Sequence, residues 1–374
     1  MHCMIPVAFG MESLVSFELK QHGIDDVFIE DGACFFDADE ALMMRLNASL
    51  RIAERIYIQY ALKTISTFDQ LFETVSSVAW ETVLQTQGQF IVQAQSKKSA
   101  LFSLRDIQKI TKKAIITRLE KKTHTTVFEE TGPPYTVLIS LNEDLCGVYL
   151  DTTGEALHKR GYRLSAGSAP LKETLAAALV SLSVYRSDRT LIDPFCGSGT
   201  IVIEAALKAR NIAPGKHRTF AYETFLGYDA TVKREVIQAL TNAEIKGPIA
   251  SILASDYDEQ ALVAARQNAE NAGVLNDIVF SNERFEMKKF SEGHHLVITN
   301  PPYGERMRQS DIETLYRSIG RAMQRTPNYS WYIYTSTLGA EKFLGRKAPR
   351  TRVLFNGPLK ARYYQYLGPK PPQE

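Results

Sequence analysis

The octapeptide Asp193-Pro194-Phe195-Cys196-Gly197-Ser198-Gly199-Thr200 decides the fold, because it joins a short apolar strand directly to a helical stretch. Gly197 and Gly199 allow a tight turn and a close approach of the backbone to a ligand. The start of the helix offers N–H groups to a carboxylate or a phosphate. No lysine follows as in a P-loop, and the spacing is not G-x-G-x-x-G, so a phosphate cradle is disfavoured. An ordinary glycine-rich turn is the alternative interpretation.

Around this turn, short apolar strands alternate with helical stretches. The expected strands are TLIDPF, SILASD, DIVFSN, HHLVITNPP and SWYIYTS, and helical stretches such as EQALVAARQNAENAG lie between them. This alternation predicts parallel strand pairing and a doubly wound α/β sheet. Ligands of such sheets bind outside the carboxyl ends of the strands, so the residues at those ends form the candidate site.

Polar residues follow the second and third of these strands. Asp256 ends the second, where an acidic side chain can accept hydrogen bonds from both hydroxyls of a ribose, so we expect a cofactor that contains a nucleoside. Asp258 is expected to cap the next helix rather than to bind a ligand. After the third strand, Asn282 or Glu283 could accept a hydrogen bond from an adenine amino group. We prefer Asn282, with a solvated turn as the alternative for both.

The fourth strand ends in Asn300-Pro301-Pro302-Tyr303-Gly304-Glu305-Arg306. An exocyclic amino group on a base is a poor nucleophile, because its lone pair is delocalised into the ring. Accepting its two N–H bonds at the Asn300 amide oxygen and the Pro301 carbonyl would return that lone pair to the nitrogen. The prolines would hold both acceptors in place beforehand. Tyr303 offers a flat face on which an extruded base can stack.

Two further interpretations of this stretch stay open. The motif Asn300-Pro301-Pro302 could be a proline turn that caps a buried strand, although the glycine turn and Asp256 at matching strand ends favour a functional site. Glu305 and Arg306 could read the edge of the base or contact phosphate, or they could form a plain salt bridge.

The N-terminal half has a different pattern, with short strands and helices of α+β type. The formal net charge of the chain is only +2, but the first 40 residues are acid-rich and Lys97 to Lys122 contains nine Lys or Arg residues. In the helix expected there, the basic residues fall largely outside the apolar face, among them Lys109, Lys112, Lys113 and Arg118. A solvated helix face is the simpler interpretation of this run alone.

Composition excludes several classes of protein. At 374 residues and 44% hydrophobic content, the chain is expected to form two domains, each with a core. No apolar run approaches the roughly 20 residues of a membrane span and the first residues lack the features of a signal peptide, so a cytoplasmic protein is expected. The four cysteines are widely spaced, so neither a disulfide framework nor a zinc site is predicted.

The motifs together resemble a known family. DPFCGSGT and NPPYGER, in this order on a doubly wound sheet, resemble motifs I and IV of the class I amino-methyltransferases. LHKRGYR followed by APLKETLAAAL resembles the segment that leads into the catalytic domain of RNA guanine-N2 methyltransferases carrying a THUMP domain. Over essentially its whole length, the chain is similar to the family of the bacterial large-subunit ribosomal RNA guanine-N2 methyltransferase and its Gram-positive-type single-unit relatives.

This resemblance implies a domain order and a binding partner. A ferredoxin-like segment would span 1–44, a THUMP RNA-binding domain 45–155, a linker 156–165 and a Rossmann-like class I methyltransferase domain 166–374. The basic helix over 97–122 would then contact RNA phosphates. Ribosomal RNA is preferred to transfer RNA as the substrate, and the protein is expected to be a monomer with no membrane partner.

The resemblance also implies S-adenosylmethionine as the cofactor and assigns the site residue by residue. Asp193, Gly197 and Gly199 would hold its methionine end, Asp256 its ribose and Asn282 its adenine, although the family commonly has Asp at the position of Asn282. The target base would be held by three residues, Asn300, Pro301 and Tyr303.

The expected reaction is direct in-line transfer of the methyl group to guanine N2, with no metal and no covalent enzyme intermediate. Cys196 lies in the cofactor turn and is not expected to act as a nucleophile. One alternative is a transfer RNA guanine-N2 methyltransferase. Another is an N6-adenine-specific DNA methyltransferase, because N-P-P-Y serves any planar exocyclic amine. The non-enzyme alternative is an RNA-binding protein with an inactive methyltransferase fold.

Overall fold

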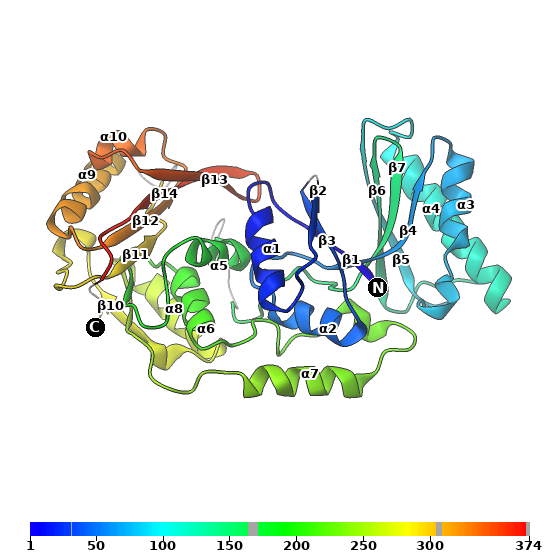
Figure 1. Ribbon diagram of the computed structural model, residues 1–374, viewed down its shortest axis with the longest axis horizontal. Coiled ribbons are helices and arrows are strands. Elements are labelled where there is room, and N and C mark those ends of the chain that lie inside the picture. Colours follow the sequence, from blue (N-terminus) through cyan, green and yellow to red (C-terminus); the bar gives the residue numbers. More distant parts are fainter. Residues whose placement is uncertain (31, 164–170, 304–308, 372–374) are drawn as a thin grey trace. The chain divides into compact units, whose positions relative to one another are not determined.

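The computed structural model describes residues 1–30, 32–163, 171–303 and 309–371, and the chain divides into two compact units (Figure 1). The N-terminal unit comprises Met1–Val7, Ser16–Leu157 and Gly215–Ala239. The C-terminal unit comprises Ala8–Val15, His158–Pro214 and Leu240–Glu374. Each unit is built around one seven-stranded sheet.

The sheet of the N-terminal unit has the strand order β2-β3-β1-β4-β7-β6-β5. Its strands are β1 (His2–Pro6), β2 (Phe28–Glu30), β3 (Ala33–Asp37), β4 (Tyr57–Thr64), β5 (Gln89–Lys97), β6 (Pro134–Asn142) and β7 (Leu145–Asp151). Neighbours are antiparallel except β5 and β6, which are parallel. The unit therefore mixes both kinds of pairing, as expected for its α+β pattern.

Helices in this half of the chain are α1 (Glu12–Gln21), α2 (Glu40–Ser49), α3 (Phe68–Ser77) and α4 (Leu104–Thr123), with a 3₁₀ turn at Trp80–Thr82. Helices α3 and α4 pack side by side (Figure 1). A capping box begins α3, in which Thr67 and Gln70 exchange side-chain and backbone hydrogen bonds. Helix α4 buries Ile107, Ala114, Ile115 and Leu119 in a core with Trp80, so its charged side is left toward solvent.

The sheet of the C-terminal unit has the order β10-β9-β8-β11-β12-β14-β13. Its strands are β8 (Leu191–Asp193), β9 (Ile252–Asp256), β10 (Ile278–Asn282), β11 (Leu296–Thr299), β12 (Ser330–Thr335), β13 (Arg350–Asn356) and β14 (Leu359–Tyr366). The first five run parallel, which confirms the predicted doubly wound α/β fold. The hairpin β13–β14 adds antiparallel pairing beside β12, and the sequence analysis had not identified it.

Helices cover both faces of this sheet. They are α5 (Glu173–Ser181), α6 (Thr200–Ala209), α8 (Glu259–Asn271), α9 (Gln309–Arg325) and α10 (Ala340–Leu344), with 3₁₀ turns at Leu275–Asp277 and Phe285–Met287. The 3₁₀ turn at Ala221–Thr224 and most of α7 (Ala230–Asn242) belong instead to the N-terminal unit. On one face of the sheet, α9 and α10 pack against Val297, Trp331 and Ile333. On the other face, the Tyr363 hydroxyl donates to the Leu179 carbonyl of α5.

Two absences concern the described part of the chain. Among the residues outside the three internal gaps and the last three positions, no helix is long and apolar enough to cross a bilayer. The same residues contain no group of three or more His, Cys, Asp or Glu side chains that could hold a metal ion.

Candidate active site

The glycine turn has the geometry that its sequence requires. Gly197 and Gly199 have φ values of +50° and +83°, a region that residues with a Cβ rarely adopt. A Cβ on Gly199 would lie 3.2 Å from the Cβ of Ala265 in α8, whereas a Cβ on Gly197 would meet nothing within 4 Å. Gly199 therefore permits the close packing of α6 on α8, and Gly197 leaves open space above the turn.

Asp193 ends β8 and points into the protein, with 1% of its surface exposed. Its Oδ1 accepts hydrogen bonds from the Thr299 hydroxyl at 2.6 Å and the Phe195 N–H at 3.2 Å. Burial raises the pKa of Asp193 to about 7, against the opposing effect of these two hydrogen bonds. The contacts of Asp193 thus join β8 to β11 and shape the glycine turn.

Asp256 ends β9 and is bound to the glycine turn. Its Oδ2 accepts from the Gly197 N–H at 2.9 Å, and its Oδ1 accepts from the Asp258 N–H at 3.1 Å. Burial raises the pKa of Asp256, and the same N–H groups oppose that rise. Each carboxylate oxygen has a second lone pair, so the side chain can still accept from a ribose.

Asp258 is the N-cap of α8, as predicted, and its carboxylate accepts from the backbone N–H groups of Gln260 and Ala261. The two acids at the end of β9 are therefore distinguished by their contacts. Asp256 is bound to the glycine turn, and Asp258 is bound to its own helix.

Asn282 and Glu283 follow β10 and differ in how they are held. The Asn282 amide donates at 3.2 Å to the carbonyl groups of both Asp256 and Tyr257, which leaves its oxygen as the acceptor of an exposed side chain. Glu283 instead forms a 2.6 Å ion pair with Lys288. Burial acts to raise the pKa of Glu283, but the hydrogen bonds from Lys288 and Ser281 outweigh it and the pKa is lowered.

Lys288 is a residue that the sequence analysis missed. Its ammonium group also contacts the Ser255 hydroxyl of β9 at 2.9 Å, so it joins the ends of two strands. A single lysine in a polar stretch has no pattern that would reveal this role. The ion pair of Lys288 with Glu283 favours Asn282 as the residue free to meet an adenine.

Asn300 follows β11, and its amide oxygen is buried without a hydrogen-bond partner among the described residues. Buried polar atoms are nearly always paired, so this amide oxygen is an acceptor that remains available to a ligand. Pro301 beside it is buried. Gly304, Glu305 and Arg306 lie outside the described residues.

Hydroxyl groups gather near Tyr303. Burial raises the pKa of Tyr316 to about 12, and the neighbouring Tyr303 contributes to the rise. The Tyr316 hydroxyl lies 2.6 Å from the Thr335 hydroxyl at the end of β12. Tyr334, also in β12, is fully buried, and burial and Tyr303 raise its pKa as well. Tyr303 is thus placed at the carboxyl end of β12, next to the strand that carries Asn300.

The segment before α5 is fastened to the helix of the glycine turn. The Arg163 guanidinium donates at 2.6 Å to the hydroxyl of Thr200, the first residue of α6, and lies 3.4 Å from the Glu173 carboxylate. The Tyr162 hydroxyl donates at 3.2 Å to Glu204, which is 1% exposed in α6. These buried polar contacts link the LHKRGYR stretch to the start of α6.

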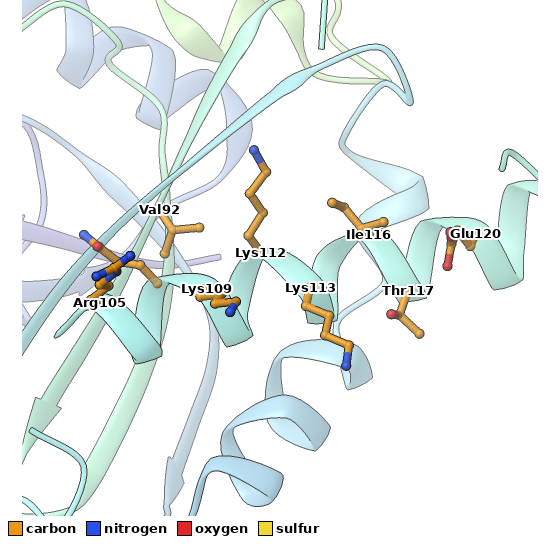
Figure 2. A pocket seen from close by; sticks show the side chains of 9 residues that line it. Val92, Arg105, Lys109, Lys112, Lys113, Ile116, Thr117 and Glu120 are labelled. Carbon is orange, nitrogen blue, oxygen red and sulfur yellow. The ribbon is translucent and has the colours of Figure 1, made fainter. Parts of the chain in front are cut away.

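A second candidate region lies on the basic helix α4. A hollow of about 670 Å³ has Val92 and Ile116 in its lining beside basic residues (Figure 2). Those basic residues are Arg105, Lys109, Lys112 and Lys113. Figure 2 shows that the lysine side chains extend in different directions from α4. The mixture suits a ligand that carries both negative charge and an apolar face.

Two of the basic residues expected on the outer face of α4 are engaged in ion pairs. Lys112 lies 2.6 Å from the Glu130 carboxylate. Arg118 donates through Nε to Glu81 at 2.9 Å and is 21% exposed, so it lies outside the buried apolar face of α4 but is partly covered by its ion pair. Glu81 lies in the 3₁₀ turn that packs on α4, a contact that the helix periodicity could not reveal. Lys109 and Lys113 are exposed.

Cys196 is buried within the glycine turn, and the structure shows all four cysteines as buried free thiols. Burial raises the pKa of Cys196 well above its ordinary value, with the charges of Asp193 and Asp256 adding to the rise. A protonated thiol is a weak nucleophile, so Cys196 lacks the activation that a nucleophilic role would need.

Comparisons with known proteins agree with this architecture. A model of the RMKL-like methyltransferase domain matches residues 160–365. A model of the RlmL ferredoxin-like domain matches residues 2–57, and a THUMP domain model matches residues 66–151.

Two relatives are similar along the chain. A protein described as the putative RNA methyltransferase YpsC of Bacillus subtilis is 40% identical, with 97% of this chain and 95% of the relative covered. The ribosomal RNA large subunit methyltransferase K/L of Buchnera aphidicola is 30% identical, with 94% of this chain covered. The alignment spans only 52% of that relative, so this chain corresponds to about half of its length.

Two solved structures share the fold over nearly the whole chain. One, from Listeria monocytogenes, is described as a predicted N6-adenine-specific DNA methylase and is 38% identical, with a TM-score of 0.92 and 98% and 96% of the two chains covered. The other, SMU.472, is a putative methyltransferase complexed with SAH that is 35% identical, with a TM-score of 0.90 and 99% and 98% covered. From the match over the catalytic half and the identity along the whole chain, the protein belongs to the RMKL-like methyltransferase family.

Proposed function

We propose that this methyltransferase uses S-adenosylmethionine to form N2-methylguanosine in 23S ribosomal RNA. One observation carries the proposal: the buried amide oxygen of Asn300 has no partner among the described residues, and it follows the strand next to the glycine turn. An acceptor held there suits the N–H group of a base. The coarser statement, a methyltransferase with this cofactor, also has the support of the SAH-bound SMU.472 structure.

The residues at the carboxyl ends of β8, β9 and β10 fit the cofactor. Gly197 leaves open space above the turn, Asp256 presents a carboxylate to a ribose, and Asn282 presents an amide oxygen to an adenine. We assign the methionine end to the turn of Asp193, Gly197 and Gly199, in which Asp193 acts by shaping the backbone. When bound, S-adenosylmethionine supplies an electrophilic methyl group on a sulfonium.

The residues of the chain then act on the base. The Asn300 amide oxygen and the Pro301 carbonyl accept the two N–H bonds of the amine and increase the electron density on its nitrogen. Tyr303 stacks on the ring and holds it in line with the methyl group. These acceptors stabilise the positive charge that grows on the nitrogen as it attacks, and the surplus proton leaves to solvent.

The N-terminal unit supports RNA as the substrate. It contains the THUMP match, and its helix α4 presents Lys109 and Lys113 beside the hollow of Figure 2. The printed names of the relatives, putative RNA methyltransferase and ribosomal RNA methyltransferase, point the same way. We keep the domain boundaries 1–44, 45–155, 156–165 and 166–374 as proposals, and we place the protein in the cytoplasm because its proposed substrate is there.

One rival has an observation in its favour. The Listeria structure is described as a predicted N6-adenine-specific DNA methylase, and the acceptors at Asn300 and Pro301 would suit adenine N6 as well as guanine N2. The THUMP domain favours RNA over this rival. Transfer RNA is the other polymer that the same domain could bind.

Mass spectrometry of nucleosides separates these possibilities. Ribosomal RNA, transfer RNA and DNA are prepared from cells with and without the gene and digested to nucleosides. We expect N2-methylguanosine to fall in a fragment of 23S ribosomal RNA and to return when the wild-type gene is restored, but not with Asn300→Ala. A loss of N2-methylguanosine confined to transfer RNA would show that transfer RNA is the substrate. A loss of N6-methyladenine from DNA would establish the rival function. No change in any of the three nucleic acids would contradict the proposal.

A further inference from the structure

The loop after β12 carries a leucine with almost no protein contact. Leu338 is 92% exposed, the highest value among the large hydrophobic residues of the described chain. Two other strongly exposed apolar side chains of the C-terminal unit, Tyr257 and Met287, follow β9 and β10. Since β10-β9-β8 is the half of the sheet assigned to the cofactor, Leu338 alone of the three follows a strand of the other half.

This loop is held in place by hydrogen bonds. The Thr337 N–H donates to the Thr335 hydroxyl at 3.0 Å, and the Thr337 hydroxyl donates to that of Tyr316 at 3.3 Å. Gly339, with φ of +68°, then begins α10 (Figure 1). An exposed leucine is common on protein surfaces. Leu338 differs in that it follows directly a residue fixed by two hydrogen bonds, and 92% of its surface is exposed.

The loop lies beside the proposed catalytic residues. Strands β11 and β12 are parallel, and Thr299 pairs with Ile333. The chain therefore leaves both strands at the same edge of the sheet, with Asn300 after β11 and the loop of Leu338 after β12. The Tyr316 hydroxyl, which accepts from Thr337, also lies close enough to Tyr303 for that residue to contribute to its raised pKa.

We infer that Leu338 packs against the bases on either side of the target nucleotide and fills the space that the target base leaves when it is extruded. The inference rests on the proposed function, because only an enzyme that takes a base out of its stack needs such a wedge. An extruded base leaves two unstacked neighbours with exposed apolar faces. Apolar side chains inserted between bases at such gaps are a known means of holding a nucleic acid open.

A matched control lies on the same sheet. Leu367 is a leucine with 44% exposure, and it follows β14 directly. Because Tyr366 pairs with Trp331 in antiparallel register, Leu367 lies at the amino end of β12, the edge opposite Leu338. Replacing each leucine with alanine removes the same atoms at the two opposite edges.

The test measures methyl transfer by the full-length protein from labelled S-adenosylmethionine to total RNA extracted from cells that lack the gene. We expect Leu338→Ala to lower kcat/KM for RNA about ten-fold, the loss of one buried leucine contact. Leu338→Met, which keeps an apolar side chain of similar size, should restore most of it. Affinity for S-adenosylmethionine and the melting temperature should not change, and Leu367→Ala should match the wild type.

Each other outcome overturns one of the two ideas. If Leu338→Ala has the wild-type kcat/KM while Asn300→Ala is inactive, the inference about Leu338 is wrong and the proposed function is unaffected. An equal loss of kcat/KM in Leu338→Ala and Leu367→Ala would show a general effect of surface leucines and would also contradict the inference about Leu338. If the wild-type protein transfers no methyl group to this RNA but does so to DNA, the proposed function itself is wrong.

Discussion

The backbone N–H of Gly197 donates a 2.9 Å hydrogen bond to the carboxylate of Asp256, which lies 59 residues further along the chain. The bond joins the glycine turn after β8 to the acid at the end of β9. Because parallel strands end at the same edge of the sheet, two residues assigned to adjacent parts of one cofactor, its methionine end and its ribose, become a single hydrogen-bonded unit.

Replacing Asp256 by alanine should therefore weaken the binding of S-adenosylmethionine by roughly 1–3 kcal/mol, through loss of the ribose acceptor and of the partner of Gly197. Isothermal titration calorimetry measures the change. Asp258→Ala is the control, since loss of that N-cap should cost about 1 kcal/mol of stability without weakening the cofactor. Undiminished affinity in Asp256→Ala would remove this residue from the site.

Asp193 should make the stability of the protein depend on pH. Its pKa is about 7 in the folded protein and about 3.9 in an unfolded chain. Between those values the unfolded state releases a proton that the folded state retains, so stability falls as the pH rises through this window, by up to about 4 kcal/mol. The stability of Asp193→Asn should not show this decrease with pH, and the variant keeps an acceptor for Thr299. The free energy of unfolding in urea, measured from pH 4 to pH 8, tests the prediction. The same dependence of that free energy on pH in both proteins would contradict it.

Asn300→Ala should lower the turnover rate about 10²–10³-fold, because the lost acceptor acts on charge that develops during the attack. Binding of RNA and of cofactor should change little. Asn300→Asp should retain part of the rate, since it keeps an acceptor of the same size. Asn328→Ala, at an exposed asparagine before β12, is the control. A wild-type single-turnover rate in Asn300→Ala would make the strand end a structural turn.

Tyr303 should act through its ring rather than its hydroxyl. Tyr303→Phe keeps the stacking face and is expected to retain activity, whereas Tyr303→Ala should lose about 1–3 kcal/mol of base stacking. The difference should appear in single-turnover methylation with saturating cofactor. Equal impairment of both variants would instead assign the function of Tyr303 to its hydroxyl, beside Tyr316 and Tyr334.

The lysines of α4 should contribute unequally to RNA binding. Neutralising Lys109 and Lys113 together should weaken binding and flatten its salt dependence, by up to about one unit of slope per lost phosphate contact. Lys112→Gln should have a smaller effect, because its ammonium group already pairs with Glu130. Filter binding from low to high salt measures the slopes. An unchanged slope in the double variant would return α4 to a merely solvated face.

Some features of this protein depend on residues that are close together in the sequence, and these features can be predicted from the sequence alone. The alternation of apolar strands and helices predicted the doubly wound sheet. The conformations of Gly197 and Gly199 and the capping of α8 by Asp258 likewise depend on residues a few positions away. For the same reason, the motifs DPFCGSGT and NPPYGER were sufficient to indicate the family.

Other features required the tertiary structure, because they depend on contacts between residues far apart in the chain. The inward position of Asp193 depends on Thr299, 106 residues away, and the position of Arg118 depends on Glu81, 37 residues away. Only the surroundings of Asn300 could reveal that its oxygen lacks a partner. Periodicity shows which side of an element is apolar, but it contains no information about which charged or polar group the folded chain brings to the other side.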